Sequence, residues 1–252
     1  MSVNGEGHSA EFIILGAAGS TGVPAIGNLW GDCDPSNPKN TRLRTSALIK
    51  YQGQNIIIDT GPDFRLQANR EMLDDIAAVL YTHDHGDHTN GIDELRVYKN
   101  RHNRDINIFG SDETLLSIQS RHQHMFESRS EFYPAVVTPH MLKAADMRQS
   151  FHVVSGLDAI PFEMQHGHIM STGYRIGDLA YCADMSFIPD ESLDVLKGIN
   201  TLVVVRELQA KLKPKNTILT VLSIHMDYAE LNGMFPEHTV PAHDGLSIKI
   251  KF

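Results

Sequence analysis

Cysteine is almost absent from this sequence of 252 residues, which contains only Cys33 and Cys182. The two lie far apart and form no CxxC pair, so a disulfide framework is excluded and a reducing compartment is favoured. Long apolar runs are missing too, because stretches such as 201–205 are far too short to cross a bilayer. The first residues lack the basic and apolar regions of a secretory signal. We therefore expect a cytoplasmic protein that makes no use of a membrane.

Positive charge is also scarce. The 22 Lys and Arg residues are outnumbered by 31 Asp and Glu residues, which gives a formal net charge of -9. Proteins that bind long nucleic acids present a basic face to the phosphate backbone. We therefore expect a small substrate rather than a large nucleic acid, although the composition is compatible with a small local basic patch.

Histidine, in contrast, is abundant: the sequence contains 14, and three of them crowd the segment 82–88. Residues 77–81, just before it, form an apolar run that is typical of a buried strand. His83 and His85 follow at the end of that strand. Alternate side chains of an extended segment point the same way, so these two imidazoles can converge on one metal ion.

The same segment turns after its first two histidines. Gly86 permits the turn, and Asp87 and His88, which follow it, can face a second ion a short distance away. Imidazole and carboxylate groups together suit Zn, Mn or Fe. A histidine-rich surface loop is the plain alternative, but the density of ligands favours a metal site.

Short apolar runs bounded by Gly, Asp, Asn and Pro recur along the chain. They begin as hairpins and later alternate with helical patterns, which is typical of sheets covered by helices on the outside. Because no linker, repeat or low-complexity block interrupts the chain, we predict a single α/β domain over 1–252. Residues 120–150 show no clear pattern. The predicted strands are 12–15, 46–50, 55–59, 77–81, 106–109, 201–205 and 216–220, and the predicted helices include 66–75 and 189–197.

Two later strand-like segments end in further metal-ligating residues. Residues 160–167 end in His166 and a glycine, and residues 179–184 end in Asp184. Alone, each side chain would as readily satisfy a backbone group at the end of an element. Beside the histidine segment they become candidate ligands, because strand ends hold side chains rigidly while the loops leave them open to substrate.

The candidate ligands follow one another in a specific order: His83, His85, Asp87, His88, His166 and Asp184. This order resembles the metal-binding motif of the metallo-β-lactamase superfamily. Further segments are similar to the phosphoribosyl cyclic phosphate phosphodiesterase branch of that superfamily, and they lie at 15–24, 30–35, 58–65, 171–177 and 244–246. The resemblance implies an α/β fold of four layers (αββα), in which two mixed sheets carry helices on their outer faces.

The same resemblance implies a site for two divalent metal ions, with Zn or Mn as the preferred metals. The ligands that it implies are His83, His85 and His166 for one ion, Asp87 and His88 for the other, and Asp184 as a bridge. Asp87 and Asp184 would then also be catalytic residues. Asp59 would lie behind the ligands and orient the histidine segment.

Three residues are candidates for contact with the substrate: Ser20, Arg65 and His168. Ser20 lies in a glycine-rich segment that could present backbone N–H groups to a phosphate, but a tight turn explains those glycines equally well. Arg65 could touch a phosphate, orient the ligands or lie at the surface. His168, like His140 and His152, could donate a proton to the leaving group or be a surface residue.

The sequence departs from the family pattern in three places. The last histidine ligand of the family follows a late strand and is missing from the corresponding segment here, 217–227, so His225 is the nearest substitute and His243 a weaker one. Relatives carry a further segment with a catalytic proton donor just before the helix-like stretch 206–212, and this sequence lacks it. Some relatives hold a structural zinc ion with clustered cysteines near the start; Cys33 stands alone, so we expect no such site.

The expected function is that of a dinuclear phosphodiesterase that acts on a small cyclic phosphate or nucleotide-like phosphodiester. Two close divalent ions would activate the attacking water and neutralise charge on the phosphate. A lactonase or thioester hydrolase with the same metals is an alternative. Another is a nucleotide-binding relative that lost catalysis together with its proton donor. By analogy with relatives, we also expect a homodimer.

Overall fold

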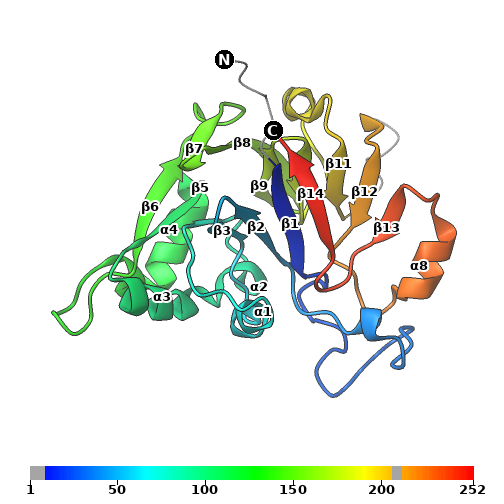
Figure 1. Cartoon of the computed structure of the whole chain (residues 1–252), viewed down its shortest axis with the longest axis horizontal. Helices are drawn as coiled ribbons and strands as arrows, with labels where there is room; N and C mark the ends of the chain where they lie inside the picture. The colour runs from blue at the N-terminus through cyan, green and yellow to red at the C-terminus, as the bar shows by residue number, and fades with distance from the viewer. Residues whose placement is uncertain (1–8, 206–211) are drawn as a thin grey trace, which may run out of the picture.

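Two seven-stranded sheets face each other in the computed structural model, which describes residues 9–205 and 212–252. Helices cover the outer sides of the two sheets (Figure 1). This arrangement confirms the predicted α/β sandwich of four layers. Within the described residues, none of the helices is both long enough and apolar enough to span a bilayer.

The first sheet is built from the first half of the chain and its last strand. Its strands are β1 (Ser9–Gly16), β2 (Ser46–Tyr51), β3 (Gln54–Ile58), β4 (Ala78–Leu80), β5 (Ile106–Ser111), β6 (Val137–Leu142) and β14 (Ser247–Lys251). Their order is β14-β1-β2-β3-β4-β5-β6, antiparallel as far as β3 and parallel from β3 to β6. The helices of this half are η1 (Pro38–Asn40), α1 (Phe64–Arg70), α2 (Gly86–Thr89), η2 (Ile92–Glu94), α3 (Leu95–His102), α4 (Asp112–Arg121) and α5 (Gln123–Phe126).

The second sheet follows in the second half of the chain. Its strands are β7 (Phe151–Val154), β8 (Leu157–His166), β9 (Ile169–Ile176), β10 (Leu179–Cys182), β11 (Thr201–Val204), β12 (Asn216–Leu219) and β13 (Thr239–Pro241). They lie in the order β13-β12-β11-β10-β9-β8-β7, with antiparallel pairs from β7 to β10 and parallel pairs from β10 to β13. The helices of this half are α6 (Asp190–Leu193), η3 (Asp194–Leu196) and α8 (Tyr228–Met234).

Strand β1 shows how the alternation of side chains builds the core. Phe12 and Ile14 belong to the core between the two sheets, and the ring centroid of Phe12 lies 5.9 Å from that of Tyr181 in β10. Ile13 and Leu15 point the other way and pack in the core under the helices. A strand that is covered on both faces therefore reads as a continuous apolar run.

Three segments need comment: one predicted helix is shorter in the structure, one unassigned region contains regular elements, and one predicted helix lies almost entirely outside the described residues. The helix predicted over 66–75 is α1, which ends earlier because Met72 adopts a left-handed φ of 51°. Residues 120–150, which showed no clear pattern, contain α5 and β6. The helix-like stretch predicted over 206–212 lies outside the described residues except for its last position.

Asp244, in the loop before β14, links three segments from the first half of the chain through hydrogen bonds. Its carboxylate accepts hydrogen bonds from the backbone N–H groups of Ala17 and Leu43, both at 3.0 Å, and from the guanidinium of Arg70 at 3.2 Å. Burial nevertheless raises the pKa of Asp244 to about 6. The folded state therefore binds a proton on Asp244 more tightly than the unfolded chain does.

We expect Asp244→Asn to change how stability depends on pH. A raised pKa in the folded state contributes stability that is complete below about pH 4 and is lost as the pH rises through about pH 6. The free energy of unfolding of the wild type, minus that of D244N, should fall by about 3 kcal/mol across that window. Urea unfolding at a series of pH values measures this difference. A difference that stays constant with pH would contradict the raised pKa.

Candidate metal centre

Three separate segments bring imidazole and carboxylate groups to one edge of the sandwich. His83 and His85 follow β4, and His88 lies in the short helix α2. His166 is the last residue of β8, and Asp184 lies just beyond the end of β10. Because these elements are buried strands or directly attached to them, the side chains are held by the rigid part of the fold.

These side chains form two overlapping clusters. In the first, the histidine cluster, potential ligand atoms of His83, His85 and His166 all lie within 4.8 Å of one another. In the second, the aspartate cluster, the same is true of His83, His88 and Asp184. The two clusters share His83. The structure thus brings together five of the seven ligands predicted from the sequence.

Asp184 lies between the two clusters. Its Oδ2 is 3.1 Å from Nε2 of His88, 3.8 Å from Nε2 of His83 and 3.9 Å from Nε2 of His166. One carboxylate oxygen is therefore close to ligands of both clusters, which is the position that a bridging ligand requires. The backbone is fixed at this point, because the hydroxyl of Ser171 donates to the carbonyl of Asp184 at 2.8 Å.

A buried network behind the clusters orients His88. Oδ2 of Asp59 lies 2.7 Å from Nδ1 of His88, and the Asp59 carboxylate also accepts from the N–H and hydroxyl of Thr82 at 2.8 and 2.7 Å. With Nδ1 donating to Asp59, the Nε2 lone pair of His88 points toward Asp184 and can bind a cation. Asp59 itself has a left-handed φ of 61°, a conformation that Asp adopts more readily than most residues other than glycine.

The surroundings of His83 fit a bound cation. Its Nδ1 lies 3.0 Å from Oγ1 of Thr82, whereas its Nε2 is buried and has no hydrogen-bond partner. An unpaired buried polar atom costs free energy unless a ligand satisfies it. His85 is exposed and His166 is half-buried, so the histidine cluster is open to solvent on their side. Imidazoles combined with a carboxylate suit zinc or manganese.

Protonation in the aspartate cluster is uneven. Burial lowers the pKa of His83 to about 2, and the charge of His88 acts in the same direction. Burial also disfavours the protonated form of His88, but the carboxylates of Asp59 and Asp184 outweigh it and raise the pKa of His88 to about 10. Burial alone would raise the pKa of Asp184, yet its hydrogen bond to His88 and the neighbouring histidine charges hold it below the usual value. A cation that binds Nε2 of His88 must therefore displace a proton, which makes metal binding dependent on pH.

Close backbone packing holds the histidine segment in place. A Cβ atom added to Gly61 would lie 2.1 Å from the carbonyl oxygen of Asp87. A Cβ atom added to Gly91 would lie 2.1 Å from the carbonyl oxygen of Gly61, and the N–H of Gly91 donates to the carbonyl of Thr60 at 2.8 Å. Glycine at these positions lets the loop after β3 pack directly against the segment that carries the ligands.

We expect Gly61→Ala to weaken metal binding and to lower the free energy of unfolding by about 1–3 kcal/mol, because the added methyl group forces the Asp87 backbone away. Gly233→Ala is the matched control. Gly233 lies in α8, and a Cβ atom there meets nothing within 4 Å, so alanine should keep or slightly raise stability. Zinc titration and urea unfolding of both variants test this. Equal metal affinity in G61A and the wild type would argue against the packing role.

Four other predicted site residues lie at the edge of the clusters or away from them. Asp87 is adjacent, with its Oδ2 3.6 Å from Nε2 of His88. His168 is exposed in the turn between β8 and β9, and Ser20 is exposed in the loop after β1. Arg65 lines a small cavity between α1 and α3, and none of the cluster residues contributes to that cavity.

The structure corrects the assignment of His225 as the last ligand. Its side chain is 68% exposed, and its Nδ1 lies 2.9 Å from Oδ2 of Asp32 rather than near either cluster. The late strand ends before it, because Val221 adopts a left-handed φ of 59° and the following residues pack against the segment near Asp32. His243 belongs to neither cluster, and its ring lies 5.8 Å from that of Tyr228 in α8, between centroids. It lies just beyond β13, and β10 to β13 are parallel, so their carboxyl ends share one edge.

The structure adds residues that the sequence did not single out. The hydroxyl of Ser117 donates to the carboxylate of Asp84, and the guanidinium of Arg121 donates to the carbonyl of Asp84, both at 2.6 Å. Both residues belong to α4, so this helix anchors the histidine segment from outside. Thr82 orients Asp59 and could have been found from its place in the motif. Ser117 and Arg121 carry no sequence signal of this role.

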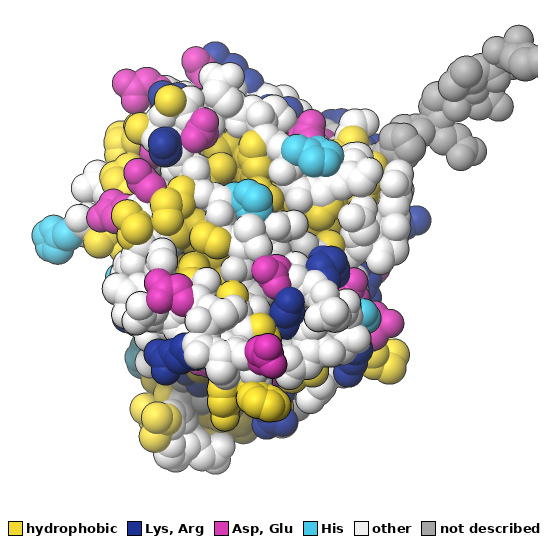
Figure 2. All heavy atoms as spheres, turned by 90° about the vertical axis from the view of Figure 1, so that its left-hand side faces the viewer, with side chains coloured by type: hydrophobic (Ala, Val, Ile, Leu, Met, Phe, Trp, Pro, Cys, Tyr) yellow, Lys and Arg dark blue, Asp and Glu magenta, His cyan; other side chains and the backbone are white. Residues whose placement is uncertain are grey.

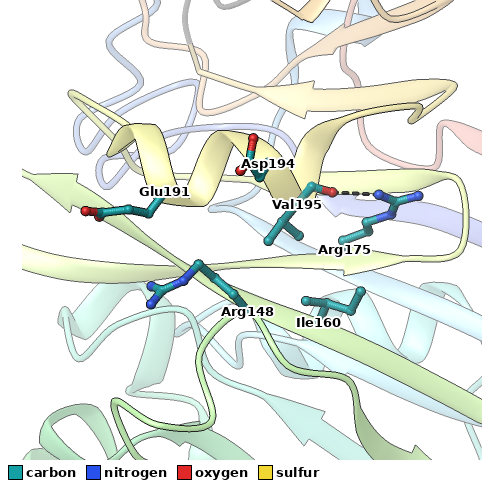
Figure 3. A pocket seen from close by; sticks show the side chains of 6 residues that line it. All are labelled: Arg148, Ile160, Arg175, Glu191, Asp194 and Val195. Carbon is teal, nitrogen blue, oxygen red and sulfur yellow. Dashed lines mark hydrogen bonds between the residues drawn. The ribbon is translucent and has the colours of Figure 1, made fainter.

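A larger cavity of about 550 Å³ lies away from the clusters, where β8 and β9 meet the segment α6–η3 (Figure 3). Its lining consists of Arg148, Ile160, Arg175, Glu191, Asp194 and Val195. Arg175 is already engaged, because its guanidinium donates to the carbonyl of Val195 at 2.6 Å. No cluster residue lines this cavity, so we keep the candidate site at the two clusters.

Comparison with known protein families gives one match. The model of a family described as beta-lactamase superfamily domain matches residues 54–252. Among curated proteins, a protein of Porphyromonas gingivalis named octanoyltransferase is 36% identical over 194 residues. The matched region is 76% of this chain but 38% of that protein, so the chain corresponds to well under half of it.

Comparison with solved structures finds the same fold over nearly the whole chain. A diphosphatase from the PhnP family has a TM-score of 0.85 and 30% sequence identity, with 97% of this chain and 98% of that chain covered. The Zn²⁺-bound PqqB of Methylobacterium extorquens has a TM-score of 0.67 and 17% identity, with 94% and 99% covered. At that identity the second likeness shows the fold alone.

Proposed function

This chain belongs to the metallo-β-lactamase superfamily, and we propose that it is a metal-dependent hydrolase that uses two divalent ions to cleave a small phosphodiester or diphosphate. The observation that carries the proposal is the position of Asp184. Its single Oδ2 lies within 4 Å of imidazole nitrogens from both clusters. A carboxylate oxygen between two sets of imidazoles is suited to hold two ions close together, and such a pair is typical of phosphoryl chemistry.

Similarity to the PhnP-family diphosphatase supports the choice of a phosphorus substrate. The two chains align over nearly their full lengths, and their identity of 30% exceeds what the fold alone requires. We propose a cyclic phosphate, a nucleotide-like diester or a diphosphate as the substrate class. The branch-like segments of the sequence favour the cyclic phosphate within this class.

The residues that would hold the ions are those of the two clusters, with Asp87 beside them. When bound, the ions would lower the pKa of a water molecule and neutralise charge on the phosphate oxygens. The side chains of the two clusters are imidazoles and a carboxylate, the groups that bind metal ions. Since the ions would activate a water molecule, we take water as the attacking group. Asp59 keeps His88 in the tautomer that presents Nε2 to the site.

The leaving group still needs a proton, and His168 is the best placed of the three spare histidines. It lies in the exposed turn between β8 and β9, two positions after a cluster residue. His140 stacks on Phe109 at 4.6 Å between ring centroids, on β6 in the other sheet. His152 pairs with Asp158 in the β7–β8 hairpin. We therefore propose His168 as the proton donor.

The distribution of surface charge supports a small substrate. On the face shown in Figure 2, acidic and basic side chains are interspersed and form no broad basic patch. The whole chain carries a formal net charge of -9. The net negative charge disfavours a long phosphate backbone, whereas one phosphate group can be held by the metal ions alone.

A substrate panel on one zinc- or manganese-loaded preparation tests the proposal. The panel contains bis-p-nitrophenyl phosphate, a five-membered cyclic phosphate, a nucleoside diphosphate sugar, a homoserine lactone and an octanoyl thioester. We expect kcat/KM for at least one phosphorus substrate to exceed the lactone and thioester values by about 10²-fold or more. The reverse order would contradict the proposed substrate class.

Hydrolysis of an acyl ester or thioester is the second candidate function. The specific observation in its favour is the relative at 36% identity, whose name refers to the transfer of an octanoyl group. More than half of that protein lies outside the match, so the octanoyl chemistry need not reside in the region that resembles this chain. The octanoyl thioester in the panel decides between the two candidates.

A further inference from the structure

A second group of potential metal ligands lies outside the candidate metal centre, in the helical layer on the first sheet. Potential ligand atoms of Asp93, His122 and His124 all lie within 4.8 Å of one another, and we call these residues the peripheral cluster. Asp93 belongs to η2, His122 is the residue between α4 and α5, and His124 lies in α5. Asp93 and His124 are 31 positions apart in the sequence, so it is the fold that brings them together, and no local sequence motif predicts the contact.

The carboxylate of Asp93 is shared between two imidazoles. Its Oδ1 lies 2.6 Å from Nε2 of His124, and its Oδ2 lies 3.6 Å from Nδ1 of His122. Ligand atoms that share one zinc ion at about 2.0–2.2 Å lie about 3–4 Å from one another, so small side-chain rotations would complete the geometry. An ordinary surface pair on this protein, His152 with Asp158, has one imidazole and joins no cluster of three within residues 9–205 and 212–252.

We propose that the peripheral cluster is a binding site for a third divalent transition-metal ion, with Zn²⁺ as the preferred ion. Two imidazoles and one carboxylate form a ligand set that favours zinc, nickel or copper over the harder magnesium and calcium ions. The site shares no residue with the histidine or aspartate cluster. Zinc binding at the peripheral cluster can therefore be tested separately from the proposed hydrolytic function.

The space beside the peripheral cluster leaves room for an additional ligand. His124 lines a cavity of about 410 Å³ together with Arg96, Arg129 and Tyr133. Three protein ligands leave at least one position on a zinc ion open to water or an anion. The guanidinium groups of Arg96 and Arg129 line the same cavity and favour an anion in it, which would balance the charge of the ion.

A metal ion bound by the peripheral cluster would link the outer helices to the region around the histidine segment. Asp93 lies shortly after α2, and His122 directly follows α4. The guanidinium of Arg121, at the end of α4, donates to the carbonyl of Asp84 in the histidine segment. Closing the chain between Asp93 and the α4–α5 junction with a metal ion would stabilise the fold around the ligands.

Zinc titration of the full chain tests this site. Wild type, His122→Ala/His124→Ala and His152→Ala are stripped of metal, loaded with Zn²⁺ and desalted, and bound zinc is counted by elemental analysis. We expect the double variant to hold one zinc ion per chain fewer than the wild type. The control H152A also removes a surface histidine paired with an aspartate, and it should hold the same number as the wild type.

Thermal unfolding adds an independent readout. Zn²⁺ should raise the unfolding temperature of the wild type by a larger amount than that of the double variant. If the double variant does not fold, Asp93→Asn takes its place, since it removes the shared carboxylate with almost no change in shape. Equal zinc content in the wild type and the folded variant would overturn the proposal. Because the readout is a zinc count, this result would leave the hydrolase proposal untouched.

Discussion

Replacing His83 or Asp184 with alanine is expected to remove bound metal and to lower kcat/KM for bis-p-nitrophenyl phosphate by about 10³-fold or more. His83 belongs to both clusters, and its Nε2 is buried without another partner. Asp184 supplies the oxygen that lies close to ligands of both clusters. Each substitution therefore affects both proposed ions. Metal content and turnover are measured on the same preparations.

His238→Ala is the control for these two variants. His238 is an exposed histidine before β13 and belongs to none of the ligand clusters formed by the described residues, so metal content and turnover should match the wild type. Circular dichroism establishes that H83A and D184A are folded before they are compared. Full metal content and full turnover in folded H83A would be incompatible with the proposed centre.

Asp59→Asn is expected to weaken metal binding by about 10–100-fold, although Asp59 touches no ion in our proposal. The Asp59 carboxylate accepts from Nδ1 of His88 and from Thr82. An asparagine that keeps the bond to the Thr82 N–H turns its NH₂ group toward His88. The proton of His88 then moves to Nε2, where it blocks the lone pair that faces Asp184.

The measurement for D59N is a zinc titration with a competing chelator. Asp63→Asn is the matched control, because Asp63 also follows β3 but pairs with Arg44 at 3.0 Å and belongs to neither cluster. D63N should lose some stability but bind zinc as the wild type does. Wild-type zinc affinity in D59N would show that the orientation of His88 does not depend on the Asp59 carboxylate.

The ligands at strand ends could be predicted because local pattern and position agree. An apolar run before His83 and another before Asp184 each indicated a buried strand, and the ligands follow those strands in the structure. The histidines at 83, 85 and 88 also stand close together in the sequence, so their convergence depends on few long-range contacts. Strand alternation and one turn were enough to derive their arrangement.

The last ligand could not be predicted by the same reasoning. His225 would lie near the site only if strand β12 were longer, but β12 ends at Leu219. The pairing of the next residues with the loop after β1 is a long-range contact, and no periodicity in the segment reveals it. His243 lies at the favourable edge only because β13 pairs in parallel with β12, which is a property of the topology.

The supporting residues were hidden for a similar reason. Ser117 and Arg121 reach Asp84 across more than 30 positions of sequence, and Asp93 meets His124 across 31. Pairs of this kind consist of common surface residue types, so each side chain alone is more simply read as solvated. Only the packing of α4 and α5 against the first sheet brings them into contact.

Anomalous scattering from crystals of the zinc-loaded protein, collected at the zinc absorption edge, tests the central claim most directly. We predict two neighbouring zinc peaks at the edge of the sandwich, one within bonding distance of His83, His85 and His166 and the other of His88, with the Asp184 carboxylate between them. Zinc peaks away from these side chains, or a folded zinc-loaded protein in which the five side chains are dispersed, would contradict it.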